Sequence, residues 1–388
     1  MLATASPVLA DEPTATPSPT ATASPTATAT PTADPDPIAN TVAPSLAGGP
    51  ARFDELLRAK RGAWTTDDGT SDELTFAYRW LRDGEPIRGA GTRDETYRLR
   101  LDDLRHRISV RVIAADADGH HLAVESAPTS AVRRSPMTVR TAPHVRGDLR
   151  FTHAVDVTRG RWATPPTQVT FRWLRDGARI RGQRAQRHPI MVPDVGHRLS
   201  VRVVATAPGY TRGVATTETT EPVRHRYDVN RHLTYRVETR GAVSGVKEFA
   251  RLAQQTMDDP RGWRGAGVAT SRVAQGGDFL LVLATPGQVA AFSSGCSAQW
   301  SCRVGRYVII NTERWNHASP AWNAAGRSLR DYRHMVVNHE LGHRLGLGHA
   351  GCSGPGRLAP VMMQQSKGRD GCRFNPWPLR TEQDRVHG

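Results

Sequence analysis

The sequence contains very little lysine: of 52 basic residues only three are lysine, at Lys60, Lys247 and Lys367. The formal net charge of +15 therefore comes almost wholly from arginine, which is scattered through every segment. A nucleic-acid-binding protein gathers its basic residues into a patch or stripe with interleaved aromatic residues, and the sequence shows no such stripe. This distribution argues against nucleic acid as a partner and leaves a loose attraction to anionic cell-surface polymers.

Long apolar runs are also missing. No stretch approaches the roughly 18 continuous apolar residues of a membrane-spanning helix, so we predict no transmembrane segment. "MLATASPVLA" ends like a signal-peptide cleavage site but lacks a basic start and most of an apolar core. The Thr/Pro/Ala/Ser-rich stretch that follows cannot bury a core. We interpret residues 1–43 as a truncated signal remnant and a disordered stalk of a secreted or cell-surface protein, expected to be a monomer.

Cysteine is absent before residue 296, which excludes an inhibitory pro-segment that works through a free cysteine. The four cysteines allow three pairings, and their spacing fits no zinc ribbon or finger. We predict the sequential pairs, Cys296–Cys302 and Cys352–Cys372, because each closes a short Gly-rich segment. Disulfides imply an oxidising compartment, which agrees with export.

An internal repeat fills the region after the stalk. "FAYRWLRDGEPIRG" from Phe76 returns as "VTFRWLRDGARIRG" from Val169, and "RISVRVIA" from Arg107 returns as "RLSVRVVA" from Arg198. Asp-Gly between two alternating stretches is a strong signal for a tight turn between strands. The second stretch of each copy places every other apolar residue on one face. The repeat therefore predicts one β-rich module used twice.

These modules resemble the bacterial immunoglobulin-like repeats of secreted and surface proteins, in the pattern W-L-R-D-G-x-x-I followed by R-[IL]-S-V-R-V. The resemblance implies two small β-sandwiches, at residues 44–137 and 138–225. Trp80 and Trp173 could stack on sugars, but a tryptophan on an alternating sandwich strand belongs to the core. We therefore expect the modules to act as spacers or adhesion units.

Residues 226–388 have a mixed α and β pattern and form the last predicted domain. Apolar residues at helical spacing indicate a helix in "SGVKEFARLAQQTMDD", and β-branched runs indicate strands. Ser328 is a suitable N-cap for a second helix, with Asp331 three residues later. The predicted strands and helices, in chain order, are 232–241, 244–259, 279–286, 307–312 and 328–346.

The chemistry of this domain is concentrated in "HELGHRLGLGH". His339 and His343 are four residues apart and share one helix face, so their imidazoles can bind one metal ion. Glu340 lies about 100° around the helix, where its carboxylate can reach a metal-bound water. Gly346 permits the helix to stop, and the chain can then return His349 as a third ligand. Three imidazoles leave the fourth position of a tetrahedral Zn²⁺ for water, as in a catalytic zinc site.

The spacing H-E-x-x-H-x-x-G-x-x-H resembles that of the metzincin metallopeptidases. The resemblance implies a downstream Met-turn, for which "APVMMQQ" offers Met362 or Met363; we prefer Met362. Several metzincins carry a tyrosine two residues after that methionine, and this sequence does not. Gln364 or His334 could take its place, although we expect His334 at the surface.

The stretch from about Tyr227 through "NPWP" also resembles an uncharacterised actinobacterial family called domain of unknown function 3152. The shared features are "VVNHELGH", "APVM", "QQSKG" and "NPWP". The fold class implied is multidomain, with two all-β immunoglobulin-like sandwiches followed by an α+β zincin- or metzincin-like domain.

Our leading hypothesis is a secreted zinc endopeptidase that hydrolyses a protein or peptide substrate. One catalytic Zn²⁺ on the three histidines would activate water, and Glu340 would act as the general base. The resemblance implies that the substrate lies along an edge strand, for which residues 306–315 are our candidate. Two alternatives remain: a surface-binding protein that uses its immunoglobulin-like modules and carries a structural zinc, and a hydrolase of non-peptide amides.

Overall fold

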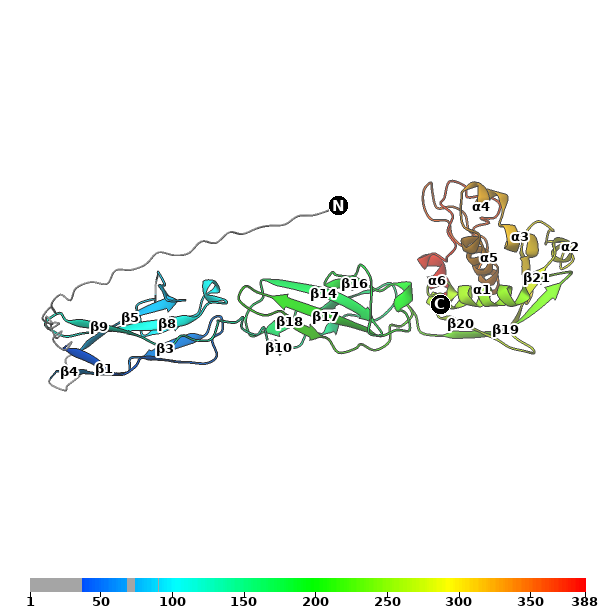
Figure 1. The fold of residues 1–388 in the computed structure, drawn as a ribbon. Coiled ribbons are helices and arrows are strands. Elements are labelled where there is room, and N and C mark those ends of the chain that lie inside the picture. Colours follow the sequence, from blue (N-terminus) through cyan, green and yellow to red (C-terminus); the bar gives the residue numbers. More distant parts are fainter. Residues whose placement is uncertain (1–36, 68–73, 90) are drawn as a thin grey trace, which may run out of the picture. The chain divides into compact units, whose positions relative to one another are not determined.

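A computed structural model of the chain describes residues 37–67, 74–89 and 91–388 (Figure 1). The predicted signal remnant and most of the predicted stalk lie outside these residues. One compact unit contains most of the first repeat, and the other contains residues 131–388 with the segments 49–55 and 98–106. Within the described ranges, no helix is long and apolar enough to cross a membrane.

The two repeats fold with the same order of strands. Each has a four-stranded sheet, a three-stranded sheet and a two-stranded sheet: β6-β5-β8-β9, β2-β3-β7 and β1-β4 in module 1, and β15-β14-β17-β18, β11-β12-β16 and β10-β13 in module 2. The elements of module 1 are β1 (Ile38–Val42), β2 (Ser45–Ala47), β3 (Leu56–Lys60), β4 (Ala63–Thr66), β5 (Thr75–Arg82), β6 (Glu85–Pro86), β7 (Thr96–Arg98), η1 (Leu101–Asp103), β8 (Ile108–Ala115) and β9 (His121–Glu125). Those of module 2 are β10 (Val139–Thr141), β11 (Val145–Arg146), β12 (Ala154–Val157), β13 (Arg161–Trp162), β14 (Gln168–Arg175), β15 (Ala178–Arg179), β16 (Arg187–Pro189), η2 (Val192–Asp194), β17 (Leu199–Thr206) and β18 (Gly213–Thr216). The prediction of one β-rich module used twice is confirmed.

Strand β1 lies inside the range that we predicted as stalk. It pairs antiparallel with β4, and Ile38 at its start is only 1% exposed. Burial of one apolar side chain together with a ladder of backbone hydrogen bonds holds this segment in module 1. The Thr/Pro-rich composition of the segment hid this short apolar signal, so the predicted boundary of the stalk at residue 43 is wrong for residues 38–42, which form β1.

The repeated tryptophans lie in the module cores. Trp80 and Trp173 are fully buried; Trp80 stacks on Tyr97, and Trp173 stacks on His188. Each indole N–H donates to a backbone carbonyl at 2.9 Å, on Asp94 and Ala185 respectively. A buried, hydrogen-bonded indole has no free face for a sugar, so the core interpretation is confirmed.

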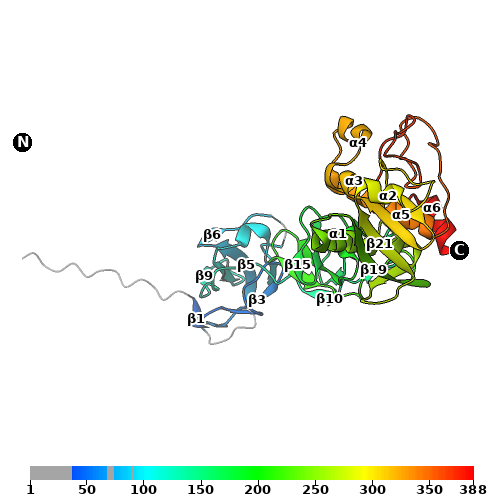
Figure 2. The same cartoon turned by 90° about the vertical axis from the view of Figure 1, so that its right-hand side faces the viewer.

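The C-terminal domain is built on one mixed sheet with the order β20-β19-β21-β23-β22. Figure 2 labels two of its central strands, β19 and β21. All neighbours in it are parallel except β22, which pairs antiparallel with β23 at one edge. Both faces of β21 are buried, which explains its continuous apolar sequence FLLVLA. The strands are β19 (Arg231–Arg240), β20 (Val268–Arg272), β21 (Phe279–Ala284), β22 (Cys302–Val304) and β23 (Tyr307–Asn311).

Two long helices, α1 (Val246–Asp258) and α5 (Leu329–Arg344), pack against one face of this sheet and share its main core. Both were predicted. The sequence analysis missed the short helices between them, so α5 is the fifth helix of the domain and not the second. The remaining elements are η3 (Trp263–Ala266), α2 (Pro286–Ala290), α3 (Thr312–His317), α4 (Pro320–Ala324) and α6 (Arg380–His387).

Candidate metal centre

Helix α5 carries the site and is fixed at its start by a side-chain cap. Ser328 accepts a hydrogen bond from the backbone N–H of Asp331 at 3.0 Å, so the predicted N-cap is confirmed. The helix is buried from His334 to Gly342. An amphipathic surface helix exposes one face along its length, but α5 runs through the core and brings the HELGH segment to the floor of a cleft.

The end of α5 turns the chain back toward the site. Gly346 has φ of +97°, and its N–H donates to His343 O at 3.1 Å, while the N–H of Leu347 donates to Gly342 O at 3.0 Å. These two bonds form a Schellman motif, which requires a left-handed residue after the helix. Gly346 supplies that conformation without the strain that a side chain would add. The turn then directs His349 back toward His339 and His343.

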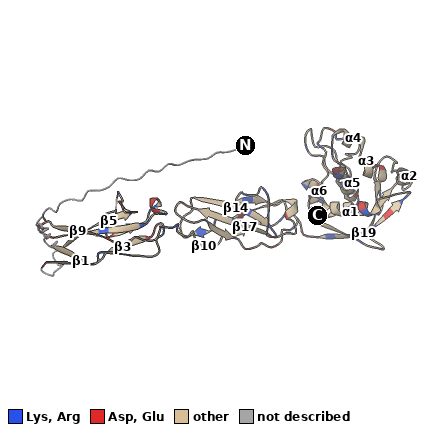
Figure 3. Ribbon diagram, in the orientation of Figure 1, with Lys and Arg blue, Asp and Glu red and all other residues tan. Residues whose placement is uncertain are grey.

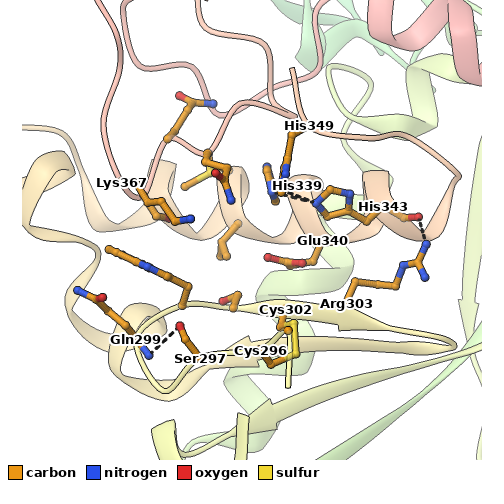
Figure 4. A pocket seen from close by; sticks show the side chains of 18 residues that line it. Cys296, Ser297, Gln299, Cys302, Arg303, His339, Glu340, His343, His349 and Lys367 are labelled. Carbon is orange, nitrogen blue, oxygen red and sulfur yellow. Dashed lines mark hydrogen bonds between the residues drawn. A yellow bond between two sulfur atoms is a disulfide. The ribbon is translucent and has the colours of Figure 1, made fainter. Parts of the chain in front are cut away.

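The three histidines converge on one point (Figure 4). His343 Nε2 lies 3.2 Å from His339 Nε2 and 3.1 Å from His349 Nε2. Two nitrogens bound to one tetrahedral zinc at about 2.0–2.1 Å would lie about 3.3–3.4 Å apart. The spacing of the imidazole nitrogens therefore fits three ligands of a single metal ion.

The tautomers of two histidines can be assigned from their other ring nitrogens. His339 Nδ1 donates to Val361 O, and His343 Nδ1 donates to Leu347 O, both at 2.8 Å. With the proton on Nδ1, each Nε2 presents a bare lone pair to its neighbour, and such lone pairs repel unless a cation lies between them. A backbone carbonyl that orients a metal-ligating histidine in this way is common in metal sites. The donor set thus fits a metal ion.

Burial keeps these imidazoles neutral. It lowers the pKa of His339 to about 3, and it also lowers the pKa of His343 and His349. The neutral imidazole is the form that binds metals. His339 is buried, His343 is partly buried, and His349 is exposed at the mouth of the cleft.

Glu340 lines the same cleft, and Figure 4 shows its side chain beside the histidine cluster. It is 5% exposed, and burial raises the pKa of its carboxyl to about 8, against a lowering effect of the Arg303 guanidinium. A carboxyl group with a pKa near neutrality can both accept and return a proton. Its carboxylate lies next to the histidine cluster without joining it, and its role as general base stays a prediction.

Met362 packs against α5 at Gly342, and its assignment as a Met-turn stays a prediction. It is 1% exposed, and a Cβ added at Gly342 would collide with its sulfur and would come within 2.9 Å of the Trp263 ring. Gly342 therefore allows the helix to approach this methionine closely. Ala350 N donates to Met362 O at 3.1 Å, which ties the turn to the residue after His349. Met363 is also buried, but it belongs to a separate small cluster with the second disulfide.

Glu382 of α6 holds the segment Val361–Met362 and was missed by the sequence analysis. Its carboxylate accepts backbone hydrogen bonds from Val361 at 3.0 Å, from Met362 at 2.9 Å and from Leu379 at 2.7 Å. It is 4% exposed, and burial raises its pKa while these three donors lower it. The segment whose carbonyl orients His339 is thus fixed by a single buried acid.

Both predicted disulfides are confirmed, and one of them shapes the cleft. Cys296 is bonded to Cys302, and Cys352 to Cys372. The cleft of about 610 Å³ lies between α5, residues 364–367 and the loop 295–303, which the first disulfide closes. Two disulfides indicate an oxidising compartment such as the extracellular space.

Two expectations about this region need correction. Strand β23, which we predicted as the substrate-binding edge, lies between β21 and β22, so β22 is the edge strand beside the cleft. His334 is not at the surface: it is 8% exposed, its Nδ1 lies 2.9 Å from Thr256 Oγ1, and its ring packs on Trp377. It does not line the cleft. Gln364 does line the cleft, in the position two residues after Met362.

Comparison with protein families gives a match over residues 205–380, to a model described as protein of unknown function (DUF3152). This chain carries a DUF3152 domain at its C-terminus. The matched range includes the three histidines, Glu340, Met362 and both disulfides, but it stops before Glu382. The DUF3152 match begins inside β17 of module 2, earlier than the likeness that we saw from Tyr227.

Solved structures with tandem domains resemble parts of the chain. They include three N-terminal domains of the bacteriophage RB49 Highly Immunogenic Outer Capsid protein (13% identity, TM-score 0.22, 51% of this chain and 65% of that chain). They also include a Ca²⁺-stabilized adhesin that helps an Antarctic bacterium bind ice (10%, 0.23, 47% and 49%) and an ICAM-5 D1–D4 fragment (14%, 0.22, 45% and 53%). The chain thus spans about half to two thirds of these structures. A comparison with curated proteins found no match.

Proposed function

We propose that the C-terminal domain is a zinc-dependent endopeptidase. The observation that carries this proposal is the convergence of three Nε2 atoms, with a buried glutamate beside them in an open cleft. A structural zinc site closes all four positions with protein ligands, whereas three imidazoles leave one position free. A purely structural site would also have no use for a carboxylate held next to its ligands.

The proposed chemistry divides between the ion and the chain. His339, His343 and His349 would hold Zn²⁺, which when bound acidifies water and polarises a carbonyl group. Glu340 takes the proton from the attacking water and later delivers it to the leaving amine. The carbonyls of Val361 and Leu347 keep the first two imidazoles in the required tautomer. The peptide substrate would lie along β22, the edge strand beside the cleft.

Replacing His343 by Ala tests the metal site directly. Loss of one of three ligands should weaken zinc binding by at least about 100-fold, since even the loss of a supporting residue costs 10- to 100-fold. Elemental mass spectrometry of the full chain after dialysis should give about one zinc per wild-type chain and almost none in the variant. His317, which is exposed on α3, serves as the control, and His317→Ala should retain zinc. A wild-type chain that is folded and binds no zinc contradicts the proposal.

A second candidate function is supported by one feature of module 2. Arg172 and Arg202 are exposed and stand directly opposite each other on β14 and β17. Like charges in this position destabilise a sheet. The matching pair in module 1 is Arg79 and Arg111. There the repulsion between the two guanidinium groups is reduced by Glu125, whose Oε2 lies 3.5 Å from Arg111 Nη2. Among the described residues, Arg172 and Arg202 have no such acidic partner. Binding of an anionic cell-surface polymer would use this pair.

The arginine pair can be tested by polymer binding, because basic residues elsewhere provide a control of equal charge (Figure 3). The full chain carrying Arg172→Ser and Arg202→Ser should bind poly(glycerol phosphate) about 10-fold more weakly. This is a loss of about 1.4 kcal/mol in binding free energy. The control removes two exposed arginines of the C-terminal domain, Arg327 and Arg357, and should bind like wild type. Equal loss in both variants would mean that only net charge matters.

A further inference from the structure

The lining of the cleft has an unusual balance of charge. Its lining residues include two permanent cations, Arg303 and Lys367, but only one carboxylate, that of Glu340. Glu340 is buried and serves the proton transfer proposed above, so it does not neutralise the mouth of the cleft. A bound divalent cation would make the site more positive still.

Lys367 has no partner of its own within the described part of the chain. Its side chain is exposed, and no hydrogen bond or ion pair involves its ammonium group. It is also one of only three lysines in a chain that otherwise uses arginine. An ammonium group on a flexible stem, free of local partners, can pair with a ligand carboxylate with little rearrangement.

The two cations lie on opposite sides of the histidine cluster. Figure 4 shows Lys367 beyond His339 and His349 at one end, and Arg303 beside His343 at the other. Arg303 Nη2 donates to His343 O at 2.8 Å, which fixes the guanidinium group at that end. A chain crossing the metal site would therefore pass one cation before the reacting bond and another after it.

We propose that the cleft selects peptides with acidic side chains flanking the bond that is cleaved, and that Lys367 is the main selecting residue on its side. The proposal rests on the endopeptidase function proposed above and adds a substrate class to it. A charge-assisted hydrogen bond between the ammonium group and a substrate carboxylate should give a preference of about 10-fold over a neutral residue, which corresponds to about 1.4 kcal/mol.

The test uses one peptide in three versions that differ only in carrying Glu, Gln or Lys at a single position. The varied residue is placed in turn at each of the three positions on either side of the cleaved bond. The wild-type full chain should give the highest kcat/KM with Glu, about 10-fold or more above Gln, at one or more positions. Lys367→Glu should reverse the order so that Lys is preferred. Lys247→Glu, an equal charge change at an exposed position of α1, should leave the order unchanged.

A binding measurement separates this inference from the proposed function. The same peptides, labelled with a fluorophore, are titrated with the zinc-loaded Glu340→Gln variant, and anisotropy reports the dissociation constant. Cleavage of all three versions at equal rates overturns the charge preference and leaves the endopeptidase proposal standing. No cleavage of any peptide overturns the endopeptidase proposal, and anisotropy then decides the charge preference: equal dissociation constants for Glu and Gln peptides overturn it.

Discussion

Replacing Glu340 by Gln should lower kcat/KM for peptide cleavage by about 10³-fold, within the range of 10²- to 10⁴-fold that general acid–base groups contribute. Gln has nearly the same shape but cannot take a proton from water. The carboxylate is not one of the three metal ligands, so zinc content should stay at about one per chain. Loss of turnover without loss of zinc would separate the base from the ligands.

The measurement needs a control for general effects of removing a carboxylate. Glu313 of α3 is about half exposed, and Glu313→Gln should keep both activity and zinc. A quenched fluorogenic peptide library, read by initial rate, supplies the substrate while its sequence preference is unknown. If Glu340→Gln retained more than about a tenth of the wild-type rate, another group would have to accept the proton.

The second large effect is expected for Glu382→Ala, on stability. The truncated side chain leaves the backbone N–H groups of Val361, Met362 and Leu379 without their acceptor. The two buried donors, on Val361 and Met362, should each cost about 1–3 kcal/mol when left unsatisfied, so the free energy of unfolding should fall by about 2–6 kcal/mol. Zinc affinity should fall as well, because the carbonyl of Val361 would no longer hold His339 in place.

Calorimetry of the full chain can follow this change in the C-terminal domain alone. The transition that moves when a zinc chelator is added belongs to that domain, and the transitions of the modules provide an internal reference. The control variant Glu313→Ala removes an exposed carboxylate. It should change the free energy of unfolding of this domain by less than about 0.5 kcal/mol. A Glu382→Ala transition within that same margin would show that water replaces the lost acceptor.

The metal site could be predicted from the sequence because it depends on local geometry. His339, Glu340 and His343 lie within two turns of one helix. Gly346 predicts the end of that helix, after which the chain can turn back and bring His349 to the other two histidines. The four-residue spacing of the two histidines on a helix places them on one face whatever the rest of the fold does. The disulfides were predictable for the same reason, since each closes a short loop. The repeat predicted two equal modules without any knowledge of their contacts.

Other features depend on contacts between distant segments, which no local pattern records. In the sequence, Glu382 has the pattern of an ordinary acidic residue in the first turn of a helix. Only folding brings its carboxylate to the backbone of Val361 and Met362, about 20 residues earlier in the chain. His334 reads as exposed, but Thr256 and Trp377 come from elsewhere to cover it. The edge position of β22 was hidden because a three-residue strand has too few residues to show alternation.

The bond between Cys296 and Cys302 sets a condition on when the cleft is complete. It closes the loop that forms the wall facing α5, and its two cysteines are only six positions apart in the sequence. In a cytoplasm that keeps thiols reduced, this wall would lack its covalent tie. If the domain is the endopeptidase proposed above, oxidation after export would complete this wall, and the protein would acquire its full cleft only outside the cytoplasm.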